Sequence, residues 1–127
     1  MKRTILVVDD NLDSVAIMRG ILEARGYEVA TALSGAEALA FLQTGTVDLV
    51  LLDIMMPVMS GIEVLQRIKQ DPTVSALPVI LVTAKAQDED LLSGYQYGAD
   101  YYITKPFTAK QLIYGIGLIL GEGDSVG

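Results

Sequence analysis

Five short apolar runs alternate with helix-length segments, and this alternation constrains the fold more than any other feature of the chain. The runs occupy residues 4–8, 28–32, 49–52, 79–82 and 101–104, and successive runs begin 21 to 30 positions apart. Each interval has room for one helix and two short loops, which is the spacing of repeated strand–helix–strand units. Because such crossovers join parallel strands, the pattern predicts an α/β fold: a doubly wound, five-stranded parallel sheet with five helices.

The length fits one domain of this class. A chain of 127 residues is typical of a single domain. We assign residues 1–121 to the folded domain and residues 122–127 to a flexible tail or truncated linker, because the last segment is rich in glycine. No apolar stretch is long enough for a signal peptide or a membrane-spanning helix, so the cytoplasm is the expected location.

Two missing residue types exclude several classes of chemistry. The chain has no cysteine and no histidine. Disulfides, thiolate nucleophiles, histidine-dependent triads and imidazole metal ligands are therefore excluded. Sixteen acidic residues against nine basic ones give a net charge of −7, which argues against direct binding to nucleic acid. The available chemistry must use carboxylates, hydroxyls, lysine or a hard metal ion.

Capping residues mark the predicted starts of the helices. Asn11 or Asp10 can cap the first helix, and Thr108 can cap the fifth. Ser34 and Ser60 are each followed three residues later by glutamate. This spacing predicts a capping box at the start of the second helix and another at the start of the third.

Polar side chains follow four of the five apolar runs. Asp9 and Asp10 follow the first run, Asp53 ends the third, Thr83 follows the fourth and Lys105 follows the fifth. Ligands of open α/β sheets bind outside the carboxyl ends of the strands, so these side chains are expected to converge. Oxygen ligands without nitrogen or sulfur select Mg²⁺, Mn²⁺ or Ca²⁺. Lysine and threonine suit phosphoryl oxygens, and a carboxylate facing them can accept a phosphoryl group.

The first strand is followed by no glycine-rich phosphate loop. Neither the G-x-G-x-x-G pattern of dinucleotide sites nor a P-loop is present. Two carboxylates occupy the place where a flavin phosphate would need an anion-binding loop. A nucleotide-binding enzyme is therefore disfavoured.

Four motifs resemble those of the receiver domain of bacterial two-component response regulators. They are ILVVDDN (residues 5–11), LVLLDIMMPVMSGIEVL (49–65), LPVILVTAKAQ (77–87) and GADYYITKPF (98–107), and the resemblance covers residues 3–120. It implies the flavodoxin-like strand order 2-1-3-4-5. It also implies a phosphorylation-switched signalling module that is not a conventional enzyme, although it catalyses its own phosphorylation and dephosphorylation.

The resemblance assigns roles to the acidic residues. It implies that Asp53 accepts a phosphoryl group from a phosphohistidine on a partner, either a histidine kinase or a histidine phosphotransfer protein. Asp10, Asp53 and the backbone carbonyl of Met55 would ligate Mg²⁺, or Mn²⁺ in its place. Asp9 would act through a metal-bound water.

The resemblance also assigns the residues of the switch. Lys105 would contact the phosphoryl group, Thr83 would hydrogen-bond to it, and Tyr102 would be the switch aromatic that becomes buried. Met55 and Lys85 stand at positions that influence the attacking water. Because neither side chain orients and deprotonates water well, slow self-dephosphorylation is expected.

Two apolar surfaces are candidates for partner binding. The fourth and fifth predicted helices and the fifth strand carry Leu91, Tyr95, Tyr102, Tyr114 and Leu118. We expect this output face to bind a downstream protein effector or a second copy of the chain. Ile17 and Ile21 lie one turn apart on the first helix and could dock a histidine-bearing helical bundle. Packing between adjacent helices is the alternative for both sets.

Two other functions stay open. One is a receiver module excised from a longer regulator or from a hybrid histidine kinase. The other is a Mg²⁺-dependent phosphatase that cleaves an outside substrate through Asp53. Such phosphatases usually carry a D-x-D pair on the first strand, whereas Asp9 and Asp10 are adjacent.

Overall fold

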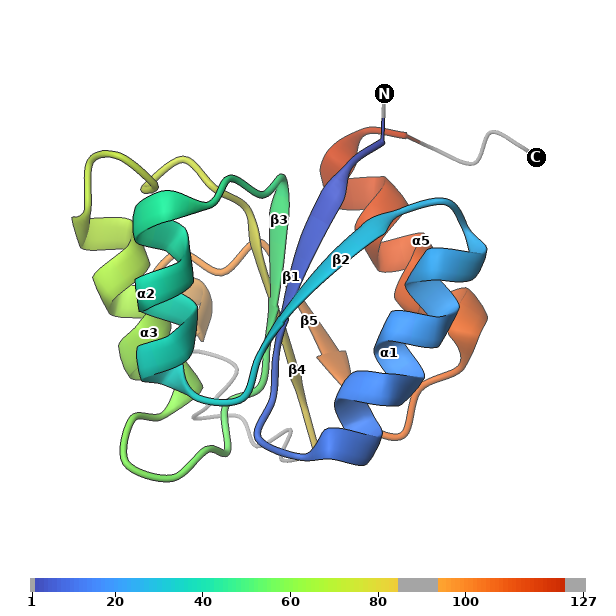
Figure 1. Ribbon diagram of the computed structural model, residues 1–127, viewed down its shortest axis with the longest axis horizontal. Coiled ribbons are helices and arrows are strands. Elements are labelled where there is room, and N and C mark those ends of the chain that lie inside the picture. The colour runs from blue at the N-terminus through green and yellow to red at the C-terminus, as the bar shows by residue number, and fades with distance from the viewer. Residues whose placement is uncertain (1, 85–93, 123–127) are drawn as a thin grey trace.

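The computed structural model describes residues 2–84 and 94–122, and the strands within them form one parallel sheet. The strand order is β2-β1-β3-β4-β5 (Figure 1). The strands are β1 Thr4–Val8, β2 Glu28–Ala32, β3 Leu49–Leu52, β4 Val79–Thr83 and β5 Tyr101–Thr104. The predicted class and order are confirmed, and the only difference in strand bounds is that β4 extends one residue further, through Thr83.

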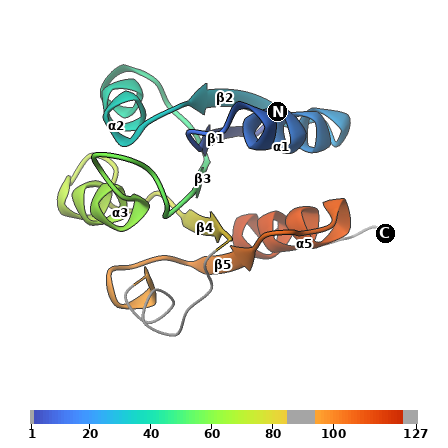
Figure 2. The ribbon, with the colours of Figure 1, turned by 90° about the horizontal axis from the view of Figure 1, so that it is seen from below.

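Helices cover both faces of the sheet. They are α1 Leu12–Ala24, α2 Gly35–Thr44, α3 Gly61–Gln70 and α5 Ala109–Leu120. Helices α1 and α5 lie on one face and α2 and α3 on the other (Figure 2). The fourth predicted helix falls largely on residues 85–93, outside the described residues, and residues 94–96 are helical. None of the helices in the described part of the chain is long and apolar enough to cross a membrane.

The central strands are buried on both faces. Along β1, Leu6 and Val8 pack in the cluster under α2 and α3, whereas Ile5 and Val7 pack in the cluster under α1 and α5. Strands β3 and β4 are likewise buried at every position. This two-sided burial explains why their sequences are continuous apolar runs rather than alternating ones.

Helix α2 begins with half of the predicted capping box. The Ser34 hydroxyl accepts a hydrogen bond from the Glu37 amide at 3.1 Å, as expected. The Glu37 carboxylate, however, accepts from the amide of Leu33 at 2.8 Å, one residue before the cap. The carboxylate therefore still satisfies a backbone donor at the helix entrance, but not that of the cap itself.

The complete capping box lies at α5. There the Thr108 hydroxyl accepts from the Gln111 amide, and the Gln111 side chain accepts from the Thr108 amide. At α3 the Ser60 hydroxyl caps the Glu63 amide, but the Glu63 carboxylate pairs with Arg67 at 3.0 Å. The predicted box at α3 is wrong in its second half, because a cation one turn along the helix takes the carboxylate.

The described chain is anchored to the sheet as far as Glu122. The Tyr27 hydroxyl donates to Glu122 at 2.6 Å, and Arg3 lies 3.5 Å from the same carboxylate. Burial, followed by the hydrogen bond to Glu122, raises the pKa of Tyr27 to about 12. Residues 123–127 of the predicted tail lie outside the described residues.

Candidate functional site

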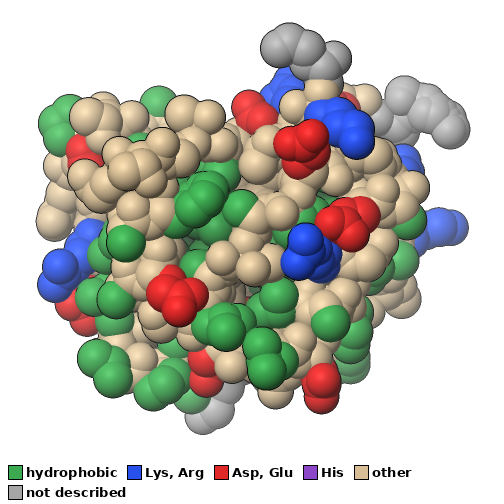
Figure 3. Space-filling model, viewed as in Figure 1, with side chains coloured by type: hydrophobic (Ala, Val, Ile, Leu, Met, Phe, Trp, Pro, Cys, Tyr) green, Lys and Arg blue, Asp and Glu red, His purple; other side chains and the backbone are tan. Residues whose placement is uncertain are grey.

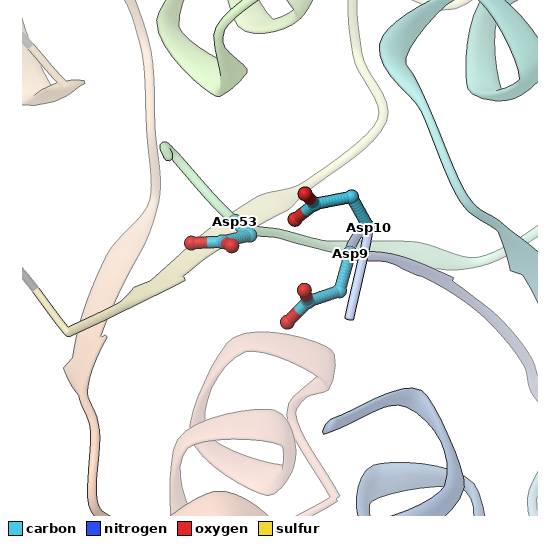
Figure 4. Close-up of side chains that lie close together, drawn as sticks. All are labelled: Asp9, Asp10 and Asp53. Atoms are coloured by element: carbon cyan, nitrogen blue, oxygen red, sulfur yellow. The ribbon is translucent and has the colours of Figure 1, made fainter. Parts of the chain in front are cut away.

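Three carboxylates meet where β1 and β3 end. The two strands are neighbours, with Val8 opposite Leu52, so the residues that follow them are side by side. Asp9, Asp10 and Asp53 each offer a carboxylate oxygen, and these oxygens lie within 4.8 Å of one another (Figure 4). Asp9 is fully buried and Asp53 nearly so, whereas Asp10 is exposed.

Lys105 reaches this cluster from the loop after β5, at the same carboxyl edge of the parallel sheet. It follows β5, which is separated from β3 by β4. Its ammonium nitrogen lies 2.7 Å from Asp9 Oδ2 and 3.9 Å from Asp53 Oδ2. The structure thus brings Lys105 to the carboxylates, as expected, but its close partner is Asp9 rather than Asp53.

Thr83 completes the set at the end of β4. Its side chain is fully buried and hydrogen-bonds to the Asp53 carboxyl group. Its carbonyl oxygen accepts from the Lys105 amide at 2.9 Å, which fixes the start of the loop that carries the lysine. Tyr102 is half-buried against the cluster under α2 and α3. The five predicted rim residues are therefore assembled at one edge.

The surroundings of Asp53 raise its pKa above the ordinary value of 3.8. Burial is the main cause, and the negative charge of Asp9 is the second. The positive charge of Lys105 and hydrogen bonds from the Met55 amide and the Thr83 side chain act in the opposite direction but do not cancel it. Burial and the neighbouring Asp9 charge therefore disfavour the ionised form of Asp53 more than the Lys105 ammonium favours it.

The donor set fits a hard divalent cation. Each carboxylate can offer an oxygen to a common centre, and crowding of like charges supplies a reason for a cation to bind. Nitrogen and sulfur ligands are missing from the cluster, which disfavours Zn²⁺ and Cu²⁺. The residues present therefore suit Mg²⁺ or Mn²⁺.

Gly61, the first residue of α3, allows the helix start to approach the backbone of Asp53 closely. A Cβ atom at Gly61 would overlap the carbonyl oxygen of Asp53, so a larger residue cannot occupy this position without a shift of the backbone. The Met55 amide donates to Asp53 Oδ1 at 3.3 Å, and the Met55 side chain is half-exposed. Lys85, the other residue expected to influence water, lies outside the described residues.

Sequence reasoning missed two residues at this site. Gly61 appears within a motif, but the close approach that requires glycine is visible only in three dimensions. Ser14, in the first turn of α1, places its hydroxyl 3.4 Å from the Lys105 nitrogen. No pattern in the sequence singles out this serine, because the contact joins residues 91 positions apart.

The candidate partner surfaces are partly exposed. Tyr95, Tyr114 and Leu118 are exposed, and Leu91 lies outside the described residues. On α1, Ile17 is exposed at 58%, while Ile21 packs partly against the cluster under α1 and α5. Ile17 is therefore the freer of the two to contact a partner.

Charged side chains form no basic surface on the face seen in Figure 3. The few basic side chains there lie mostly beside acidic ones. This distribution agrees with the net charge of −7 and offers no footprint for a nucleic-acid backbone on that face.

Comparison with known proteins gives consistent matches. A family model described as the response regulator receiver domain matches residues 5–116. The phosphate regulon transcriptional regulatory protein PhoB of Pseudomonas aeruginosa is 39% identical over 126 residues, covering 97% of this chain and 55% of that protein. A probable cyclic di-GMP phosphodiesterase of Vibrio cholerae is 47% identical over 109 residues, covering 86% of this chain and 24% of that protein.

A solved structure supports the same relationship. The CheY-like receiver domain protein of Methanospirillum hungatei has a TM-score of 0.90 and 34% identity, with 96% of each chain covered. The chain spans about half the length of PhoB and about a quarter of the phosphodiesterase.

Proposed function

The chain belongs to the family of response regulator receiver domains, which are phosphorylation-switched signalling modules rather than conventional enzymes, and we propose that Asp53 is its phosphoacceptor. One observation carries this proposal: the Asp53 carboxylate lies in a cluster of three, 3.9 Å from an ammonium group. A carboxylate that faces positive charge at an open strand end can attack a phosphorus atom. The cytoplasm is the expected place of this exchange.

The acidic residues would hold the cation that the family uses. Asp10, Asp53 and the Met55 carbonyl are the proposed direct ligands, and Asp9 is the proposed partner of a bound water. When bound, Mg²⁺ supplies positive charge that offsets the charge of the phosphoryl oxygens. Mn²⁺ prefers the same oxygen donors and is the expected substitute.

The chain's own residues then have distinct tasks in the transfer. An oxygen of Asp53 forms the new bond to phosphorus while the bond to the imidazole nitrogen of the partner's phosphohistidine breaks, and the imidazole leaves. The Lys105 ammonium moves from Asp9 toward the phosphoryl oxygens. Thr83, which hydrogen-bonds to the Asp53 carboxyl group, donates instead to a phosphoryl oxygen, and Tyr102 becomes more buried beside it.

Intact-protein mass measurement tests the acceptor. Incubated with Mg²⁺ and acetyl phosphate, the parent chain should gain one phosphoryl group, and removal of Mg²⁺ should prevent the gain. Asp53→Asn should abolish it, because an amide is a poor nucleophile. The matched control is Asp13→Asn, which changes an exposed aspartate of α1 and should leave phosphoryl uptake as in the parent. Uptake by the Asp53→Asn variant would show that the acceptor is elsewhere.

Two surfaces would convey the signal. We assign docking of the histidine kinase or phosphotransfer protein to Ile17 and Ile21. We assign the output face to Tyr95, Tyr102, Tyr114 and Leu118, together with Leu91. A downstream protein or a second copy of the chain is the proposed ligand, because Lys110 is the only basic residue of α5 and offers little to nucleic acid.

Substitution separates these surfaces. If Tyr95 and Tyr114 belong to the output face, changing each to alanine should weaken phosphorylation-dependent self-association, measured by sedimentation, or effector capture. Tyr97→Ala removes another exposed tyrosine and serves as the control. If the phosphorylation-dependent contacts survive both substitutions, the output role belongs instead to the α1 surface of Ile17 and Ile21.

A further inference from the structure

A closed ring of hydrogen bonds joins Lys105 to the first turn of α1. The Lys105 ammonium donates to Asp9 Oδ2 at 2.7 Å, and the Asn11 amide donates to Asp9 Oδ1 at 2.9 Å. The side chain of Asn11, which caps α1, accepts from the Ser14 amide at 2.9 Å. The ring closes at Ser14, whose hydroxyl oxygen lies 3.4 Å from the Lys105 nitrogen.

This ring holds the ammonium group on the α1 side of the site. Among the described residues, its hydrogen-bond acceptors Asp9 and Ser14 are nearer than Asp53, which is 3.9 Å away. The Asn11 amide and side chain fix Asp9 and the helix start, so the two acceptors keep their positions relative to each other. The lysine therefore rests against a preorganised pair of oxygens rather than against the acceptor.

The contact with Ser14 is specific to this resting position. At 3.4 Å it is already near the outer end of the hydrogen-bond range. A movement of the ammonium that lengthens this distance by a few tenths of an ångström breaks it, whereas the bond to Asp9 starts at 2.7 Å and can lengthen without being lost. An interaction present only in the resting position stabilises that position relative to the one that engages a phosphoryl group.

We propose that Ser14 is a positioning residue that holds the Lys105 ammonium on the Asp9 side of the site and so restrains its approach to a phosphoryl group on Asp53. The inference rests on the proposed function, since it needs Asp53 as acceptor. It adds a residue of α1 to the set that sets the rate of phosphorylation. The helix that would dock the phosphodonor thereby touches the lysine that would act on the phosphoryl group.

The test compares Ser14→Ala with Ser14→Thr. Loss of the hydroxyl should speed phosphorylation by acetyl phosphate and Mg²⁺ by about fivefold, which corresponds to about 1 kcal/mol. Threonine keeps the hydroxyl and should retain the parent rate. Asp13→Asn alters the same helical turn without contacting Lys105 and should also leave the rate unchanged.

A second readout needs neither metal nor phosphoryl transfer. In the metal-free chain, the NMR resonance of the Lys105 ammonium should shift in Ser14→Ala and stay near its parent position in Ser14→Thr. A general structural effect of changing Ser14 would shift the resonance in both variants, not only in the one that lacks the hydroxyl.

The outcomes are distinct. An unchanged or slower rate in Ser14→Ala, with the parent phosphorylated normally, overturns the restraint by Ser14. An unshifted ammonium resonance overturns the contact itself. A parent chain that takes up no phosphoryl group contradicts the proposed function instead, and the metal-free resonance still decides whether Ser14 holds the lysine.

Discussion

Replacing Lys105 with methionine should destabilise the metal-free domain strongly. Asp9 is fully buried, and the Lys105 ammonium 2.7 Å away is its close cationic partner. Methionine keeps much of the aliphatic stem but removes the charge. The variant therefore removes the Lys105 charge from beside three neighbouring carboxylates, one of which, Asp9, is excluded from water.

The expected cost follows from the burial of the pair. Removing one partner of a fully buried ion pair typically costs about 3–5 kcal/mol. Two features reduce this figure: the Lys105 side chain is 21% exposed, and Asp9 keeps the hydrogen bond from the Asn11 amide. We expect a loss of about 2–3 kcal/mol in the free energy of unfolding, which lowers the melting temperature by about 10 °C for a domain of this size.

Urea denaturation at pH 7 without divalent metal measures the loss. Lys110→Met removes an exposed lysine from α5 and should change the free energy by less than about 0.5 kcal/mol. The double variant Asp9→Asn/Lys105→Met replaces the pair with uncharged groups and should recover at least half of the loss. Saturating Mg²⁺ should also stabilise Lys105→Met, because the cation supplies the missing charge.

Two results would refute this reasoning. One is a Lys105→Met variant within about 0.5 kcal/mol of the parent, which would mean that solvent screens the pair. The other is a double variant no more stable than Lys105→Met, which would mean that the lysine stabilises the fold through its stem rather than its charge.

Three further predictions follow from charge and exposure. Because the pKa of Asp53 is raised in the folded state, its ionisation opposes folding, so Asp53→Asn should be more stable than the parent in urea at pH 7 without metal, and the difference should vanish below pH 3.8, where the group is protonated in both states. Met55→Asn should lose its phosphoryl group faster than the parent in a mass time course, because an amide can orient water and a thioether cannot. Absorbance titration should find Tyr27 ionising at about pH 12, with stability lost as the pH rises from 10 to 12, and Glu122→Gln should lower that pKa.

The strands were predictable because strands buried on both faces appear in the sequence as short, continuous apolar runs. A strand covered on both faces must be apolar at each position, and β1, β3 and β4 are short runs of this kind between polar turns. Helix starts were predictable to the extent that one side chain bonds one amide, as at Ser34 and Ser60. The second bond of each capping box, from the cap amide to the glutamate side chain, was not predictable. Glu37 accepts from the Leu33 amide and Glu63 from Arg67 instead.

The sequence predicted which residues would meet at the site, but not which carboxylate would pair with Lys105. Parallel strands place their carboxyl ends at one edge, so residues that follow four runs had to meet there. Which carboxylate takes the lysine depends on side-chain reach across β4 and on the loop after β5. Lys105 pairs closely with Asp9 rather than Asp53 because Asp9 is the more buried of the two acids. The other carboxylate oxygen of Asp9 is fixed by the Asn11 amide.

The pairing of Lys105 with Asp9 explains why the lysine should move when the domain binds a cation and is phosphorylated. Among the described residues, the Lys105 ammonium is the cation that lies beside the three carboxylates, and its short contact is with Asp9, the most deeply buried of them. A cation at the carboxylates would remove the need for Lys105 at Asp9, since it compensates the same charge. The lysine would then be held on the α1 side mainly by Ser14, a weak contact that a phosphoryl group with several acceptor oxygens can outcompete. Charge compensation at Asp9 thus couples cation binding to the freedom of Lys105, and the increase in phosphorylation rate caused by Ser14→Ala should be largest at saturating Mg²⁺.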